Sequence, residues 1–484
     1  MLPTVGDMWM DRTKKAGLAA AGLITVIAAT AGCSGARSDT PEPGARSAGD
    51  PLVSYLGNGG YDVASYEVGY DFRPGETTMA SSVTIKATSL QALSEFSLDS
   101  AGQKITRVTV DGVQAGHRSE SEKLIISPAA PVAKGTEFRV AIDFVADRQA
   151  RPQSPAGDTV SNLKQWINFP DGFALFGQPD RAHLFFPMND TLQDKARMTF
   201  KISAPADLQV AANGRRTERV EKDGRATSTF TTRDEISTQF VQATVGRYDE
   251  FTGSTATGMP LRSLIDTKVG ARARPSVDLA GDQVAWMEKE TGTAYPFEVF
   301  GLLGVDAASA NGAALETATI PIYSAEGLTD PSRTPLVHEL AHQWFGAAVT
   351  PKTWFDNWIS EANASFYQYK YFDAVGTKKF QDSIANAYAQ DAELRSDGGP
   401  AAKPKDVFAA IGQSYGGGII MLYGLEKKVG AEKFKQIQKT FFEKYRYKSA
   451  STRDYIDTAN AVSGEDLTGY IESWLYSPTA PPMP

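Results

Sequence analysis

The segment His338-Glu339-Leu340-Ala341-His342 constrains this chain more than any other feature of its sequence. On an α-helix, residues four positions apart lie on one face, so both imidazoles can point at one cation. Glu339 then lies beside the open side of that cation, where a carboxylate can act as a general base. We predict such a helix because Thr334 can cap it, Pro335 suits its first position and Gly346 offers an exit.

A catalytic metal site of this kind normally has a third protein ligand. Glu361 follows His342 by nineteen positions, in a segment that we predict to be helical as far as about Val375. A second helix packed against the first would aim Glu361 at the same cation. An isolated glutamate is usually a surface residue, so only this spacing favours the ligand interpretation. We expect His183 to be structural, because three ligands are found without it.

Composition restricts the partners of the chain. Its 484 residues include 49 Lys and Arg against 57 Asp and Glu, a net charge of −8. That balance argues against a nucleic-acid partner, which requires a positive field for its phosphates, whereas acidic sites suit metals and ammonium groups. The length predicts two to four domains. A single cysteine, Cys33, excludes an intrachain disulfide.

The first 33 residues have the order of an export signal. Basic residues at 12–15 precede an apolar run at 16–31 that ends in Gly32-Cys33. The run is too short and too rich in Ala and Gly for a convincing membrane-spanning helix. Its ending resembles a bacterial lipobox, so we expect a lipoprotein anchored through Cys33 on the extracytoplasmic face of the cell membrane. The alternative is a plain secretory signal and a secreted protein. The candidate start codons are Met1, Met8 and Met10.

The rest of the chain changes character once. Residues 34–52 are rich in Ser, Gly, Pro and charge, which predicts a flexible linker. Residues 53–251 show short stretches of period-two alternation, which indicate an antiparallel β-sandwich or saddle-like domain. Residues 252–484 pass into helical periods, with a capping box at Ser451 and Asp454. We therefore predict an α+β multidomain protein whose second domain is mainly helical.

The metal-binding pattern of residues 338–361 resembles that of the aminopeptidase N family, zinc peptidases of the gluzincin type. The similarity extends over nearly the whole mature chain. Residues 57–63 resemble the first strand of the family's N-terminal β domain, and Gln178 with residues 186–190 resembles its substrate-facing edge. Residues 312–317, Gly-Ala-Ala-Leu-Glu-Thr, fall where the family carries Gly-Ala-Met-Glu-Asn, and Tyr415-Gly416-Gly417-Gly418 falls where it carries its catalytic tyrosine.

This resemblance implies a thermolysin-like catalytic domain that removes N-terminal residues from peptides with one zinc ion per chain. The implied metal ligands are His338, His342 and Glu361. The implied catalytic residues are Glu339 as general base and Tyr415 as the phenol that stabilises negative charge in the transition state. The implied anchor for the substrate's α-ammonium group consists of Glu316, Gln178 and Asp180. The donor set favours zinc but would also accept cobalt or manganese.

Several positions depart from the family pattern and leave the side-chain preference open. Leu315 and Thr317 replace Met and Asn, and Ser360 and Ala362 flank Glu361 in place of Asn and Gly. Two further positions differ: Asp180, where Glu is frequent, and Gly417, where Lys is usual. We also expect the chain to lack the family's large C-terminal helical domain and therefore to have a more open cleft.

Two other functions remain compatible with these residues. A zinc endopeptidase or a peptidase of narrow specificity would use the same metal chemistry. A metal-stabilised but inactive peptide-binding lipoprotein would have no use for a base beside the metal, so Glu339 and Tyr415 speak against it.

Overall fold

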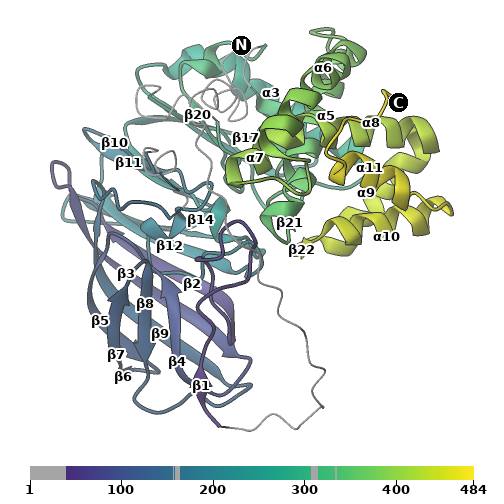
Figure 1. Ribbon diagram of the computed structural model, residues 1–484. Coiled ribbons are helices and arrows are strands. Elements are labelled where there is room, and N and C mark those ends of the chain that lie inside the picture. Colours follow the sequence, from purple (N-terminus) through teal and green to yellow (C-terminus); the bar gives the residue numbers. More distant parts are fainter. Residues whose placement is uncertain (1–39, 156, 158–163, 307–313, 333–334) are drawn as a thin grey trace.

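A β-rich N-terminal half leads into a mainly helical C-terminal half (Figure 1). The computed structural model describes residues 40–155, 157, 164–306, 314–332 and 335–484. This arrangement confirms the predicted α+β class. The predicted export signal, Cys33 and residues 34–39 lie outside the described residues. Among the helices that are described, none has the length and apolarity needed to cross a bilayer.

The core of the N-terminal half is built on an eight-stranded sheet with the order β14-β15-β12-β2-β3-β9-β5-β6. Side chains along β2, β3 and β9 alternate between buried and exposed, because one face of the sheet packs on the core and the other faces solvent. Its strands are β2 (Tyr61–Asp71), β3 (Thr78–Ser89), β5 (Lys104–Val110), β6 (Val113–Gln114), β9 (Glu137–Asp147), β12 (Arg197–Pro205), β14 (Arg215–Lys222) and β15 (Arg225–Thr231).

Two four-stranded sheets complete this half. One has the order β1-β4-β8-β7 and the other the order β10-β11-β16-β13. Their strands are β1 (Glu42–Pro43), β4 (Leu93–Asp99), β7 (Gly116–Glu120), β8 (Lys123–Ser127), β10 (Trp166–Phe169), β11 (Gly172–Leu175), β13 (Gln209–Ala212) and β16 (Ala243–Gly246). Gln178 follows β11 and so leaves the second sheet toward the helical half.

The C-terminal half begins with a sheet of order β17-β18-β19-β20. Its strands are β17 (Tyr248–Ser254), β18 (Pro260–Asp266), β19 (Leu303–Val305) and β20 (Ile322–Ser324). The predicted boundary after residue 251 falls within β17. A short parallel pair, β21 (Val349–Pro351) and β22 (Lys448–Ala450), joins two later segments of this half.

Nine described helices make up the rest of this half. They are α3 (Arg274–Thr291), α4 (Leu336–Ala341), α5 (Trp358–Ala374), α6 (Phe380–Gly398), α7 (Val407–Gly412), α8 (Gly417–Val429), α9 (Ala431–Tyr445), α10 (Thr452–Ser463) and α11 (Thr468–Tyr476). The predicted capping box at Ser451 and Asp454 does begin α10. α5 packs against both α4 and α8, which places it at the centre of the helical layer.

The prediction of a flexible linker is wrong for residues 40–52. β1 pairs in parallel with β4, and Arg46 forms ion pairs with Glu95 at 3.1 Å and Glu120 at 3.2 Å. Asp50 is buried and accepts a hydrogen bond of 2.9 Å from the Trp354 amide in the helical half. The segment has few apolar side chains to bury, which is why its composition predicts a flexible linker. Its contacts are made by the main chain and by charged side chains instead, and composition does not reveal such contacts.

A buried charged group fixes the segment between Gln178 and β12. His183 Nδ1 lies 2.7 Å from Asp190 Oδ2, and its other ring nitrogen lies 3.5 Å from Glu122. Arg181 donates to Glu122 at 2.6 Å, and Thr238 donates to Asp190 at 2.9 Å. Within the described structure His183 therefore serves packing and charge pairing in the β-rich half, as expected.

This buried group makes stability depend on pH. Burial opposes the charged imidazole, but hydrogen bonds to Asp190 and Glu122 outweigh it and raise the pKa of His183 from 6.5 to about 9. A raised native-state pKa stabilises the folded protein fully below about pH 6.5, and this stabilisation is lost as the pH rises through about 9. We expect the Tm from calorimetry to fall across this range, with a contribution of about 3 kcal/mol at most.

The matched comparison is His183→Gln. This variant should have a lower Tm than the wild type at pH 6.5, and the difference should shrink as the pH rises. A constant difference between the two proteins would contradict the charged imidazole.

Candidate metal and substrate site

α4 presents two imidazoles from its C-terminal end. The rings of His338 and His342 lie 4.7 Å apart at an angle of 80°. The helix is shorter than predicted, because Pro335 is its N-cap rather than its first residue and His342 is already its C-cap. Gly346 has a φ of +136°, where a Cβ would meet Ser360 Oγ at 2.7 Å. The chain therefore turns sharply behind His342. Thr334 lies outside the described residues.

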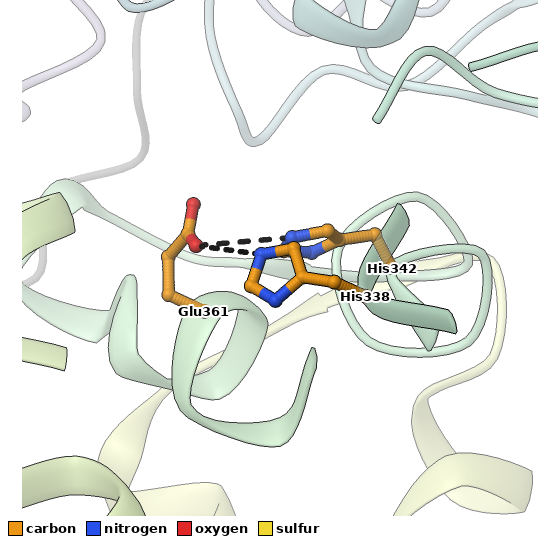
Figure 2. Close-up of side chains that lie close together, drawn as sticks. All are labelled: His338, His342 and Glu361. Atoms are coloured by element: carbon orange, nitrogen blue, oxygen red, sulfur yellow. Dashed lines mark ion pairs between the residues drawn. The ribbon is translucent and has the colours of Figure 1, made fainter. Parts of the chain in front are cut away.

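α5 brings a carboxylate to these rings (Figure 2). Glu361 Oε2 lies 3.6 Å from His338 Nε2 and 3.8 Å from His342 Nε2, and all three side chains are buried. A tetrahedral ion with bonds of about 2.0–2.1 Å sets such atoms about 3.3–3.4 Å apart. The structure thus brings the three predicted ligands together in an arrangement that fits one divalent cation after small side-chain movements.

The far nitrogens of both rings have partners. His342 Nδ1 lies 2.9 Å from Ser360 Oγ and 3.3 Å from the Phe345 carbonyl oxygen, and His338 Nδ1 lies 3.4 Å from Ser365 Oγ. Such partners orient a ligating imidazole and leave its Nε2 for the metal. The sequence singled out Ser360 only as a departure from the family pattern. Its position directly before Glu361, on the helix that carries the third ligand, was the available signal.

Ionisation states in the site follow from burial and charge. Burial lowers the pKa of His342 to about 3, so the ring is neutral and has a lone pair to offer. Burial opposes the charge of Glu361, but His342 and His338 outweigh it and lower the pKa of this carboxyl. Burial, and then the charges of Glu316 and Glu361, raise the pKa of Glu339 well above its usual range. The two carboxyls therefore differ, with Glu361 suited to a ligand and Glu339 to a proton acceptor.

Glu316 and Gln178 meet across the two halves of the molecule. Gln178 Nε2 donates to Glu316 Oε1 at 2.5 Å. Ligand atoms of Glu316, Glu339 and His342 lie within 4.8 Å of one another, so the predicted anchor borders the metal ligands. Burial and the charge of Glu361 raise the pKa of Glu316 to about 8. A cationic group at this carboxylate would relieve that cost.

Asp180, the third predicted anchor residue, has other partners. It is fully buried, and its carboxylate accepts hydrogen bonds from the Tyr55 hydroxyl and, at 3.1 Å, from Ser154 Oγ. Its assignment to the anchor stays a prediction.

Leu315, which departs from the family pattern, forms a β-bridge with Ile322 and packs in a small apolar cluster. Its neighbour Glu316 is directed to the metal side.

Tyr415 closes the site from the direction of α8. It ends a short 3₁₀ turn, and its hydroxyl donates to Glu361 Oε2 at 2.7 Å. Burial, and then the charge of Glu361, raise the pKa of Tyr415 well above 10, so the phenol stays a donor. A Cβ on Gly418 would meet the Cβ of Ala362 at 2.8 Å. Gly418 therefore lets α8 begin directly against α5.

Comparison with known proteins gives matches along most of the chain. The peptidase M1 N-terminal domain model matches residues 63–240, and the peptidase family M1 domain model matches residues 276–474. The structure of an M1 zinc metallopeptidase from Deinococcus radiodurans, bound to a Tyr-Ser-Ala substrate, superposes with a TM-score of 0.80 at 24% identity. That match covers 90% of this chain and 99% of the other.

Curated relatives are similar at the same level of identity. The leucyl aminopeptidase of Saccharolobus solfataricus is 23% identical, over 79% of this chain and 50% of its own length. Aminopeptidase M1-B of Oryza sativa is 25% identical, over 60% of this chain and 35% of its own length. The chain thus spans about half or less of the length of these relatives.

The contacts of the far ring nitrogens predict unequal effects on metal binding. Ser360→Ala removes the 2.9 Å partner of His342 and should weaken the affinity for a divalent ion about tenfold, the lower end of the range for such residues. Ser365→Ala removes only a 3.4 Å contact and should change the affinity less. Chelator competition measures both, and a larger effect for Ser365→Ala would contradict the proposed orientation of the rings.

Proposed function

Since the chain belongs to peptidase family M1, we propose that it is a zinc-dependent aminopeptidase that hydrolyses N-terminal residues from peptides, with one zinc ion per chain. The observation that carries this proposal is the convergence of His338, His342 and Glu361 beside the Gln178–Glu316 pair. The first group offers three ligands to a metal, and the pair offers an acceptor to an ammonium group. An aminopeptidase needs the metal and the acceptor for the ammonium group close enough for one substrate to contact both.

The chemistry divides among the side chains already described. Zinc held by the three ligands supplies Lewis acidity and lowers the pKa of a bound water toward 7. Glu339 accepts the proton of the attacking water and later gives it to the leaving amine. The Tyr415 hydroxyl, now on Glu361 Oε2, can donate to the former carbonyl oxygen as negative charge develops there. No covalent nucleophile is needed.

The anchor supplies the exopeptidase character. Glu316 accepts hydrogen bonds from the substrate's α-ammonium group, and Gln178 holds that carboxylate in place from the β-rich half. The buried position of Glu316 makes its charge costly without a cation, so a charged N-terminus is favoured over a neutral one.

For its location, we propose export and anchoring to the outer face of the cell membrane through a lipid on Cys33. The support is the sequence alone: the basic start, the apolar run and the small residues before the cysteine.

Replacement of the proposed base should abolish turnover without removing the metal. Glu339→Gln is expected to lower kcat by about 10²- to 10⁴-fold on aminoacyl-arylamides, because the amide cannot accept the proton. Zinc content, measured by atomic absorption, should stay at one ion per chain. Retention of full activity would sink the assignment of Glu339.

Blocking the N-terminus distinguishes an aminopeptidase from an endopeptidase with the same metal. N-acetylation of a peptide substrate should reduce kcat/KM by about 10²-fold or more, because the buried carboxylate loses its cationic partner. Mass spectrometry of the digest reports the cleavage position. Glu316→Gln should lose activity on the free peptide and discriminate less between the two peptides. Equal internal cleavage of both peptides by the wild type would favour the endopeptidase.

A further inference from the structure

Lys195 reaches from the β-rich half into the helical half. It lies two residues before β12, and its side chain is buried. Its Nζ donates to the carbonyl oxygens of Ala347 and Ala348, both at 2.9 Å. These carbonyls belong to the loop between α4 and β21, directly behind the proposed metal ligands. Lys195 is therefore a direct polar link between the N-terminal half and that loop.

The loop in turn holds His342. The Ala347 amide donates to the His342 carbonyl oxygen at 2.8 Å, and the Ala348 amide donates to the Gln343 carbonyl at 3.1 Å. The Phe345 carbonyl faces His342 Nδ1 at 3.3 Å. A displacement of the peptide groups at 347 and 348 would thus be transmitted to both the main chain and the ring of this ligand.

Lys195 is a costly residue at this place. Burial lowers its pKa to about 7, and the charge of Glu235 only partly opposes this. Among the described residues, no carboxylate forms an ion pair with it. The hydrogen bonds satisfy the two buried carbonyl groups, but the desolvation of an amine that no carboxylate pairs with costs free energy. The contact therefore adds little net stability to the fold. The contact is better explained by the position that it imposes on the loop.

We propose that Lys195 is a positioning residue for the metal: it ties the N-terminal half to the loop behind His342 and so increases the affinity for zinc. The inference rests on the proposed zinc site. It makes the β-rich half part of the proposed metal site, although none of the described residues in that half is among the proposed ligands.

A second buried lysine provides a matched control. Lys123 Nζ binds Asp99 Oδ1 at 2.5 Å and the Gly57 carbonyl oxygen at 2.8 Å. These partners all lie within the β-rich half. Lys123→Met therefore disturbs the same half of the molecule as Lys195→Met but leaves the contact to the loop intact.

The test is chelator competition with zinc on the full chain. Lys195→Met should weaken the zinc Kd about tenfold, at the lower end of the range for residues that hold metal ligands. Lys123→Met should keep the wild-type Kd even if its Tm falls, and Lys195→Arg, which retains donors, should recover part of the affinity. An unchanged Kd in Lys195→Met, or an equal loss in Lys123→Met, would overturn the proposal. A wild-type chain that binds no zinc would overturn the proposed function instead.

Hydrogen exchange on the wild type gives a measurement that needs no variant. If Lys195 couples the loop to the β-rich half, zinc must stabilise that contact by as much as the contact stabilises zinc binding. Amides of residues 192–198 should exchange more slowly in the zinc-loaded protein than in the metal-free one, and those of residues 121–127 should not change. Equal exchange at 192–198 in the two states would contradict the coupling.

Discussion

Three buried carboxylates around two imidazoles are the constraint on which the rest of the site depends. Glu316, Glu339 and Glu361 share one interior region, where like charges repel strongly because little solvent screens them. Burial, and then this repulsion from Glu361, raise the pKa of Glu316 to about 8. Such a region is stable with its acids ionised only if cations enter it. In the proposed function, a divalent metal and a substrate ammonium group are these cations, so the proposed metal binding and the proposed specificity for a free N-terminus both derive from the same concentration of negative charge.

The β-rich half is part of this site rather than a separate module. Gln178 orients Glu316, Asp50 caps the Trp354 amide, and Lys195 holds the loop behind His342. Each contact crosses from one half to the other and uses a buried polar group. Because such groups are costly when unpaired, the two halves are held in one relative position more strictly than by apolar packing alone.

The sequence predicts an arrangement best when the residues that determine it lie close together in the chain. His338 and His342 are about one helical turn apart, so the sequence alone predicts that both rings lie on one face of the helix. The pairing of Gln178 with Glu316 joins residues far apart in the chain and was accessible only through a family resemblance. Ser360 had only its position next to Glu361 as a signal, and Lys195 had none, since their roles arise from packing of α5 on α4 and of one half on the other. Composition likewise failed for residues 40–52, because their contacts use the main chain and the charged side chains of Arg46 and Asp50.

The order of these parts along the chain has a consequence for biosynthesis. Gln178 leaves the ribosome first, Glu316, the two histidines and Glu361 follow, and Tyr415 emerges after all of them. No shorter nascent chain contains a complete set of ligands, base, anchor and proton donor. Under the proposed function, the growing polypeptide therefore stays inactive toward the peptides around it until Tyr415 has been made and has folded against Glu361.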